Sequence, residues 1–154
     1  MNSVRFIRFE HNGALNCIPP TTLDSVSDAF GTFGTLVDGG HRLFERALLL
    51  SELQSRGWSQ KVKVDASSSI TITSLQGRTG LCLQTGNVAR MYADLLKLQL
   101  LFHREKLNAG ILVVGNRPTS ENDNKATYGR LVKELGIFRE VVTVPLLVYG
   151  LEVR

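Results

Sequence analysis

Between residues 61 and 84 the hydrophobic pattern repeats at every second position, which is the spacing of a half-buried β-strand. The alternation falls into three short segments, at 61–65, 69–73 and 80–84, with turn-forming residues between them. Three such segments in succession predict an antiparallel meander. The middle of the chain is therefore expected to form part of a β-sheet.

Helical and buried patterns flank this region. Residues 41–56 carry an apolar stripe and are followed by Gly57, a residue type that favours the left-handed end of a helix. Asn87 is expected to cap a long helix over 87–106 that is apolar on more than one face. The continuous apolar run at 110–115 is typical of a fully buried strand.

The remaining segments complete the expected order. A short strand is expected at 4–9, a helix from Thr21 or Thr22, and a glycine-rich loop at 31–40. A short helix over 125–135, ending at Gly136, and a strand over 141–149 close the chain. This order predicts an α/β fold with a mixed central sheet, the meander plus crossover strands, flanked by helices.

Length and composition limit the class of protein. The 154 residues, without an internal repeat or a composition break, predict a single domain over 1–154. No membrane span or signal peptide is evident, so a cytoplasmic protein is expected. Cys17 and Cys82 are too few for a disulfide framework or a four-cysteine zinc site. A net charge of +4 and a pI of about 9.3 permit a nucleic-acid partner.

Several short motifs, spread over nearly the whole chain, resemble one enzyme family. Residues 80–90, Gly-Leu-Cys-Leu-Gln-Thr-Gly-Asn-Val-Ala-Arg, are similar to the catalytic strand and following helix start of the BglII/BstYI type of restriction endonuclease. Further similarities lie at 10–15, 56–58, 109–115 and 144–152. The resemblance implies a restriction-endonuclease-like core with double-stranded DNA as partner.

The resemblance also implies a catalytic site, and here the chain departs from the family. The resembled enzymes hold Mg²⁺ with an Asp on one strand and a Glu on the next, followed two residues later by Gln or Lys. The matching positions carry Thr73, Cys82 and Gln84, and no acidic residue lies between Asp65 and Asp94. A neutral hydroxyl and a soft thiol are poor ligands for Mg²⁺. We therefore expect a degenerate site with no metal and no cleavage.

Two other functions remain open. A carboxylate elsewhere in the chain could restore an Mg²⁺-dependent endonuclease, with Asp65, Glu45, Glu52 and Glu10 as candidates. Alternatively, the old cleft is vestigial and the chain is a protein-interaction module without a nucleic-acid role.

The favoured expectation is a DNA-binding regulator or inactive partner of a restriction system. Arg78, Gln84, Asn87 and Arg90 are expected to cluster near the former catalytic cleft, where phosphates would lie, and Lys61 and Lys63 to project from one face of a strand. The candidates are Lys61, Lys63, Arg78, Gln84, Asn87 and Arg90, with Arg42 and Arg46 as a second basic patch. The competing interpretation is a solvated strand edge, where lysines prevent aggregation.

The long helix over 87–106 carries more apolar residues than one sheet face needs. The resembled enzymes are symmetric dimers through helices near this point, so a homodimer is expected. The predicted seam consists of Leu95, Leu98, Leu101 and Phe102.

Overall fold

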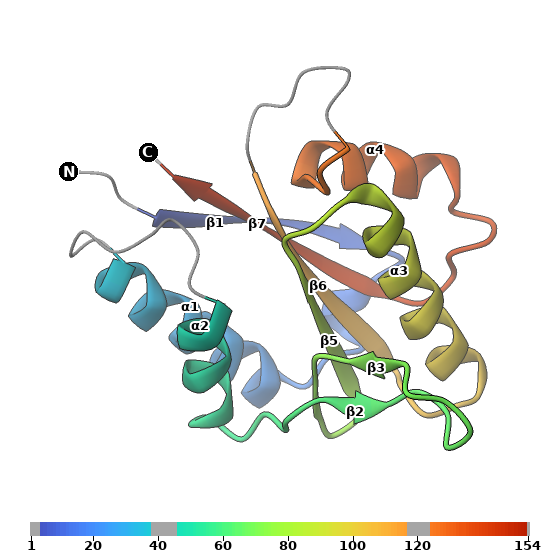
Figure 1. The fold of residues 1–154 in the computed structure, drawn as a ribbon, viewed down its shortest axis with the longest axis horizontal. Coiled ribbons are helices and arrows are strands. Elements are labelled where there is room, and N and C mark those ends of the chain that lie inside the picture. Colours follow the sequence, from blue (N-terminus) through green and yellow to red (C-terminus); the bar gives the residue numbers. More distant parts are fainter. Residues whose placement is uncertain (1–3, 38–45, 117–123, 154) are drawn as a thin grey trace.

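A five-stranded mixed sheet forms the centre of the molecule in the computed structural model, which describes residues 4–37, 46–116 and 124–153 (Figure 1). The strand order is β1-β7-β6-β5-β4. β5, β6 and β7 are parallel, while β1 and β4 pair antiparallel at the two edges. The bounds are β1 Val4–His11, β4 Ser74–Gln76, β5 Thr79–Gln84, β6 Ala109–Gly115 and β7 Leu146–Val153.

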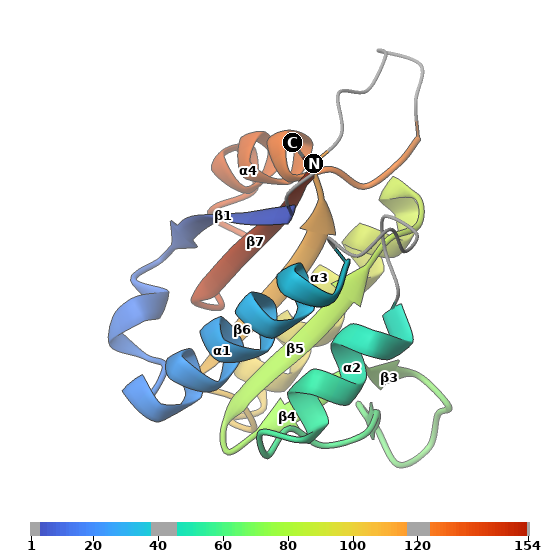
Figure 2. The same cartoon turned by 90° about the vertical axis from the view of Figure 1, so that its left-hand side faces the viewer.

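Helices cover both faces of this sheet, so the predicted α/β fold is confirmed (Figures 1 and 2). A hydrophobic cluster lies on each face of the sheet, and alternate residues along β5 point into one or the other. Leu81 and Leu83 pack in the first cluster and Cys82 in the second. The first cluster contains α1 Pro20–Val37 and α2 Arg46–Gln54, and the second contains α3 Val88–His103 and α4 Tyr128–Ile137. A single 3-10 turn, η1 Ala14–Asn16, leads into α1.

The predicted three-strand meander is wrong in one respect. β2 Val62–Lys63 pairs with β3 Thr71–Ile72 in a separate two-stranded sheet, not in the central one. The chain passes from the small sheet into the central one at Thr73, whose hydroxyl accepts a hydrogen bond from the Leu83 backbone N–H. Because Val64 and Ile72 bury their side chains in the α3 cluster, the small sheet packs against that helix instead.

The expected glycine-rich loop is also wrong over 31–37, where α1 continues as a helix. Glycine weakens a helix by only about 0.5–1 kcal/mol, and the buried stripe of this helix outweighs that cost. The stripe includes Val26, Ala29, Phe30 and Phe33. Residues 38–40 lie outside the described part of the chain.

Other boundaries are close to expectation. Gly57 adopts a positive φ of 92°, and Asn87 caps α3 by accepting from the Arg90 N–H, as predicted. α4 starts later than expected, at a Thr127 cap, and runs through Gly136 rather than ending there. The last strand is shifted to 146–153, after Pro145. In the described ranges, each helix is too short or too polar to cross a membrane.

Candidate nucleic-acid interface

The carboxyl end of β5 is the place where the sequence predicts the site. β5 pairs with the backbone of β4 only as far as Leu81. Beyond Leu81, side chains from other segments form hydrogen bonds with the β5 backbone. The Leu83 N–H donates to Thr73 Oγ1 at 3.0 Å, and the Leu83 carbonyl accepts from Arg46 Nη1 at 2.7 Å. The strand edge is therefore closed by a hydroxyl and a guanidinium, which satisfy backbone groups that a neighbouring strand would otherwise bond.

A polar network links β5 to α3 at the same place. Gln84 Nε2 donates to Asp94 Oδ2 at 2.9 Å, and Gln84 Oε1 accepts from the Gly86 N–H at 2.7 Å. Lys97 Nζ lies 3.2 Å from the other carboxylate oxygen, Asp94 Oδ1. The Asp94 side chain is 9% exposed. Because a buried carboxylate is costly without partners, these two contacts account for its presence in the core.

Asp94 was not among the residues predicted from the sequence. It lies one turn after Met91 and one turn before Leu98, inside the buried stripe of α3. An acidic residue in an apolar helix stripe is rare unless it is paired. That position within the apolar stripe of α3 is the sequence signal that points to Asp94.

Cys82 lies beside this network and is almost fully buried, at 1% exposure. Burial raises the pKa of the Cys82 thiol, and the Asp94 carboxylate raises it further. The thiol therefore stays protonated at neutral pH. A neutral, buried thiol serves neither as a nucleophile nor as a metal ligand.

This environment predicts the reactivity of the two cysteines. At pH 8, Ellman's reagent is expected to titrate only the half-buried Cys17 in the folded chain, and both thiols after unfolding in guanidinium. The variant Cys17→Ser is expected to show no rapid reaction until it unfolds. A fast-reacting thiol in folded Cys17→Ser would contradict the burial and pKa assigned to Cys82.

Three of the predicted DNA-contacting residues come together. Gln84 ends β5, Asn87 caps α3, and Arg90 lies in the first turn of that helix. Arg78 does not join them, so the expected cluster is wrong in that member. It precedes β5 and donates to Asn108 Oδ1 and the Glu105 carbonyl. Six residues of strand separate it from Gln84, about 20 Å at 3.3 Å per residue.

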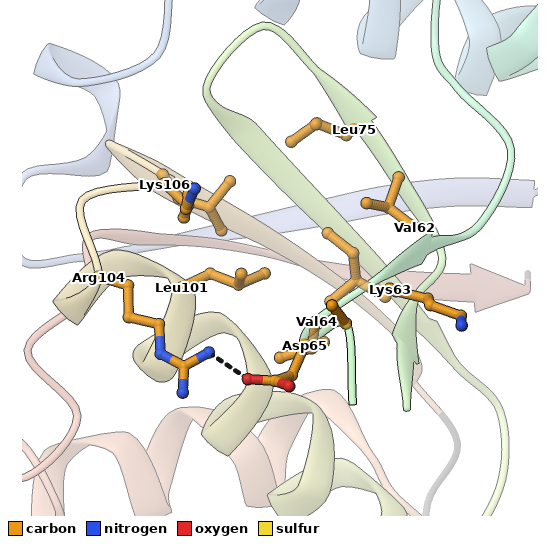
Figure 3. A pocket seen from close by; sticks show the side chains of 11 residues that line it. Val62, Lys63, Val64, Asp65, Leu75, Leu101, Arg104 and Lys106 are labelled. Carbon is orange, nitrogen blue, oxygen red and sulfur yellow. Dashed lines mark hydrogen bonds and ion pairs between the residues drawn. The ribbon is translucent and has the colours of Figure 1, made fainter. Parts of the chain in front are cut away.

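Lys63 lies near the carboxyl-terminal end of α3, away from the residues at its first turn. It belongs to the short strand β2, and Lys61 directly precedes that strand. Lys63 lines a cavity of about 420 Å³ together with Arg104 and Lys106 (Figure 3). Asp65 lines this cavity too and pairs with Arg104 at 2.7 Å. Hydrogen bonds from Ser67 and Arg104 hold the pKa of Asp65 well below its usual range. Asp65 is therefore not a carboxylate of the β5 site.

The other acidic candidates are also placed elsewhere or not described. Glu52 pairs with Arg56 along α2 at 2.6 Å, and Glu10 accepts the Leu15 N–H at the end of β1. Glu45 and Arg42 lie outside the described residues. Among the residues that are described, no group of three or more His, Cys, Asp or Glu side chains is arranged to hold a metal ion.

Comparison with protein-family models finds a match over residues 26–151 to the restriction endonuclease BglII/BglIII family. The chain belongs to the BglII restriction endonuclease family. Its fold matches the solved structure of BglII complexed with a DNA 16-mer, with a TM-score of 0.77 and 13% identity, over 95% of this chain and 75% of that one. Free BglII matches with a TM-score of 0.70 and 14% identity, over 95% and 78%. A comparison with curated proteins finds no match.

Membership of the BglII family raises the question of Mg²⁺ at the end of β5. Mg²⁺ requires hard oxygen ligands in near-octahedral geometry. The only described carboxylate in the network is Asp94, and the Lys97 ammonium 3.2 Å from its Oδ1 opposes a dication there. The Thr73 oxygen is neutral, and the Cys82 thiol is buried and soft. This set of donors does not fit Mg²⁺.

Proposed function

We propose that the chain binds duplex DNA without cutting it and acts as a regulator or an inactive partner within a restriction system. One observation carries the proposal: in a restriction-endonuclease fold, the carboxyl end of β5 holds cations but no carboxylate from the described residues of the strands beside it. Arg46 and Lys97 lie there, and Arg90 lies in the first turn of α3. Thr73 and Cys82 stand where the family resemblance places the two acids. Phosphate contacts of this kind supply most non-specific affinity. A DNA-binding role also favours a cytoplasmic location for the protein.

The test is a gel-shift assay with mixed-sequence duplex DNA at low and high salt, with and without Mg²⁺ or Mn²⁺. The proposal predicts a salt-sensitive shift, and DNA that stays intact with either metal. Absence of binding at low salt would contradict it and would favour the protein-interaction module.

A second candidate function is Mg²⁺-dependent DNA cleavage, which requires a relocated carboxylate at the β5 site and, if that carboxylate is Asp94, release of its ion pair with Lys97. Asp94 reaches the β5 site from α3, as a relocated carboxylate must. The test compares plasmid nicking by Asp94→Asn with nicking by Asp65→Asn, which removes a carboxylate remote from the site. Metal-dependent nicking that only Asp94→Asn abolishes would establish cleavage. Intact plasmid with the unmodified chain would exclude it.

We also propose a homodimer through α3, but with a different seam from the predicted one. Leu95, Leu98 and Leu101 are buried in the chain's own core, so they are not free for a partner. Leu96 on the same helix is 68% exposed. One turn before it, Tyr92 contacts Phe138 edge-on, with ring centroids 5.9 Å apart. Nearby Val141 is also exposed, and the four side chains form the proposed seam.

The dimer proposal predicts the effect of a charge at this seam. Leu96→Asp is expected to convert a dimer to a folded monomer, because an unpaired carboxylate is costly in an apolar interface. Sedimentation analysis measures the mass of both chains, and Ile70→Asp, at another exposed apolar position, serves as the control. A monomeric unmodified chain, or a dimer that persists in Leu96→Asp, would contradict this seam.

A further inference from the structure

Cations approach the carboxyl end of β5 from both faces of the sheet. Arg46 is the first residue of α2, which packs in the cluster on one face. Lys97 belongs to α3, which packs in the cluster on the other face. Arg46 bonds the Leu83 carbonyl, and Lys97 joins Gln84 through their shared partner, Asp94. The two cations therefore flank neighbouring residues of one strand.

The charges in this group favour an anion over a cation. Among the described residues of this group there are two positive side chains, Arg46 and Lys97, and one carboxylate, Asp94. Both cations also act electrostatically on the thiol of Cys82, opposing the upward shift of its pKa caused by burial and Asp94. This excess of positive charge among the described side chains is the reverse of what a site for a divalent metal requires.

The donors of these side chains suit a phosphodiester. The guanidinium of Arg46 carries five N–H donors, of which the Leu83 carbonyl takes one. The planar fork of a guanidinium matches two phosphate oxygens, and an ammonium adds a point charge. The Lys97 side chain is 25% exposed, so it is not sealed within the core.

We propose that Arg46 and Lys97 together hold one backbone phosphate of duplex DNA at the end of β5, in the place of a metal ion. This inference rests on the proposed DNA-binding function. It adds that the phosphate contact does not depend on a divalent metal, because the positive charge is supplied by two side chains. In this arrangement Asp94 and Gln84 are positioning residues, because they orient the Lys97 ammonium and the β5 turn without touching the phosphate.

The test measures binding of a fluorescent mixed-sequence duplex by anisotropy, in EDTA and in Mg²⁺, over a range of salt concentrations. The double variant Arg46→Gln, Lys97→Gln is compared with Lys106→Gln, Arg139→Gln, which removes the same charge at exposed positions outside the site. The double variant Arg46→Lys, Lys97→Arg keeps the charge. Circular dichroism confirms that each variant is folded.

The inference predicts the same affinity in EDTA and in Mg²⁺ for the unmodified chain. The variant Arg46→Gln, Lys97→Gln is expected to lose about 10- to 100-fold in affinity and to lower the salt slope by about 1, as expected for one phosphate that is no longer neutralised. The control variant Lys106→Gln, Arg139→Gln is expected to lose much less affinity. The variant Arg46→Lys, Lys97→Arg is expected to keep most of its affinity.

Two outcomes would overturn the inference while leaving the proposed function in place. One is binding that requires Mg²⁺ and disappears in EDTA. The other is equal loss of affinity in the site pair and the remote pair, with DNA still bound. Failure of the unmodified chain to bind DNA at low salt would overturn both.

Discussion

Replacing Leu98 with alanine is expected to lower the free energy of unfolding by about 4–5 kcal/mol, near the top of the range for such truncations. Leu98 is fully buried in α3 and lies over two glycines, Gly80 in β5 and Gly110 in β6. A Cβ built on either glycine would lie 3.1 Å from a Leu98 methyl carbon. Because glycines have no side chain that can fill the space, the cavity left by alanine persists.

Urea unfolding followed by circular dichroism measures this loss, and Leu96→Ala is the matched control. Leu96 lies two residues earlier on α3 and is largely exposed, so its truncation is expected to change monomer stability by less than about 0.5 kcal/mol. The comparison is made at a protein concentration that keeps both variants monomeric. Similar unfolding midpoints for the two variants would contradict the packing of α3 on the glycine pair.

Replacing Gly150 with alanine is expected to cost about 2–3 kcal/mol, as overpacking of a tight contact does. A Cβ at this position in β7 would lie only 2.7 Å from Cγ of the Tyr128 ring. Tyr128 is the first residue of α4, and the Thr127 cap fixes the start of that helix. The ring therefore has little freedom to move away.

Thermal unfolding measures this loss, and the control is a substitution at a glycine whose added Cβ would meet open space. Gly129→Ala, within α4, meets nothing within 4 Å and is expected to stabilise the chain by up to about 1 kcal/mol. Adding Tyr128→Ala to Gly150→Ala is expected to recover part of the loss, because the clashing ring is gone. A neutral Gly150→Ala would show that α4 does not rest on β7 through this contact.

Much of the fold was predictable because local patterns and long-range packing agree. The apolar run of β6 and the Asn87 cap of α3 each indicate one structure, and the molecule adopts it. The glycines of α1 were misleading, since propensity favours a loop and only the buried face of the helix decides the outcome. The early strands were misassigned for a similar reason. Alternation shows that a segment is a strand but not which sheet it joins.

The site was less predictable than the fold. The family resemblance pointed to Thr73, Cys82 and Gln84, and these residues lie on neighbouring segments of β-structure. Asp94 and Lys97 enter from a helix, and no strand spacing points to them. Arg78 was misplaced for the opposite reason, since closeness to β5 in sequence does not tell which end of the strand a residue occupies.

The most direct measurement of the central claim, that this BglII-family chain binds DNA without cutting it, is the salt dependence of its affinity for a duplex in Mg²⁺, with the DNA recovered afterwards. We expect affinity to fall steeply with salt, by a logarithmic slope of about 0.9 for each phosphate neutralised. The recovered DNA is expected to be intact. Salt-independent binding, no binding, or DNA nicked in proportion to the bound fraction would contradict the account.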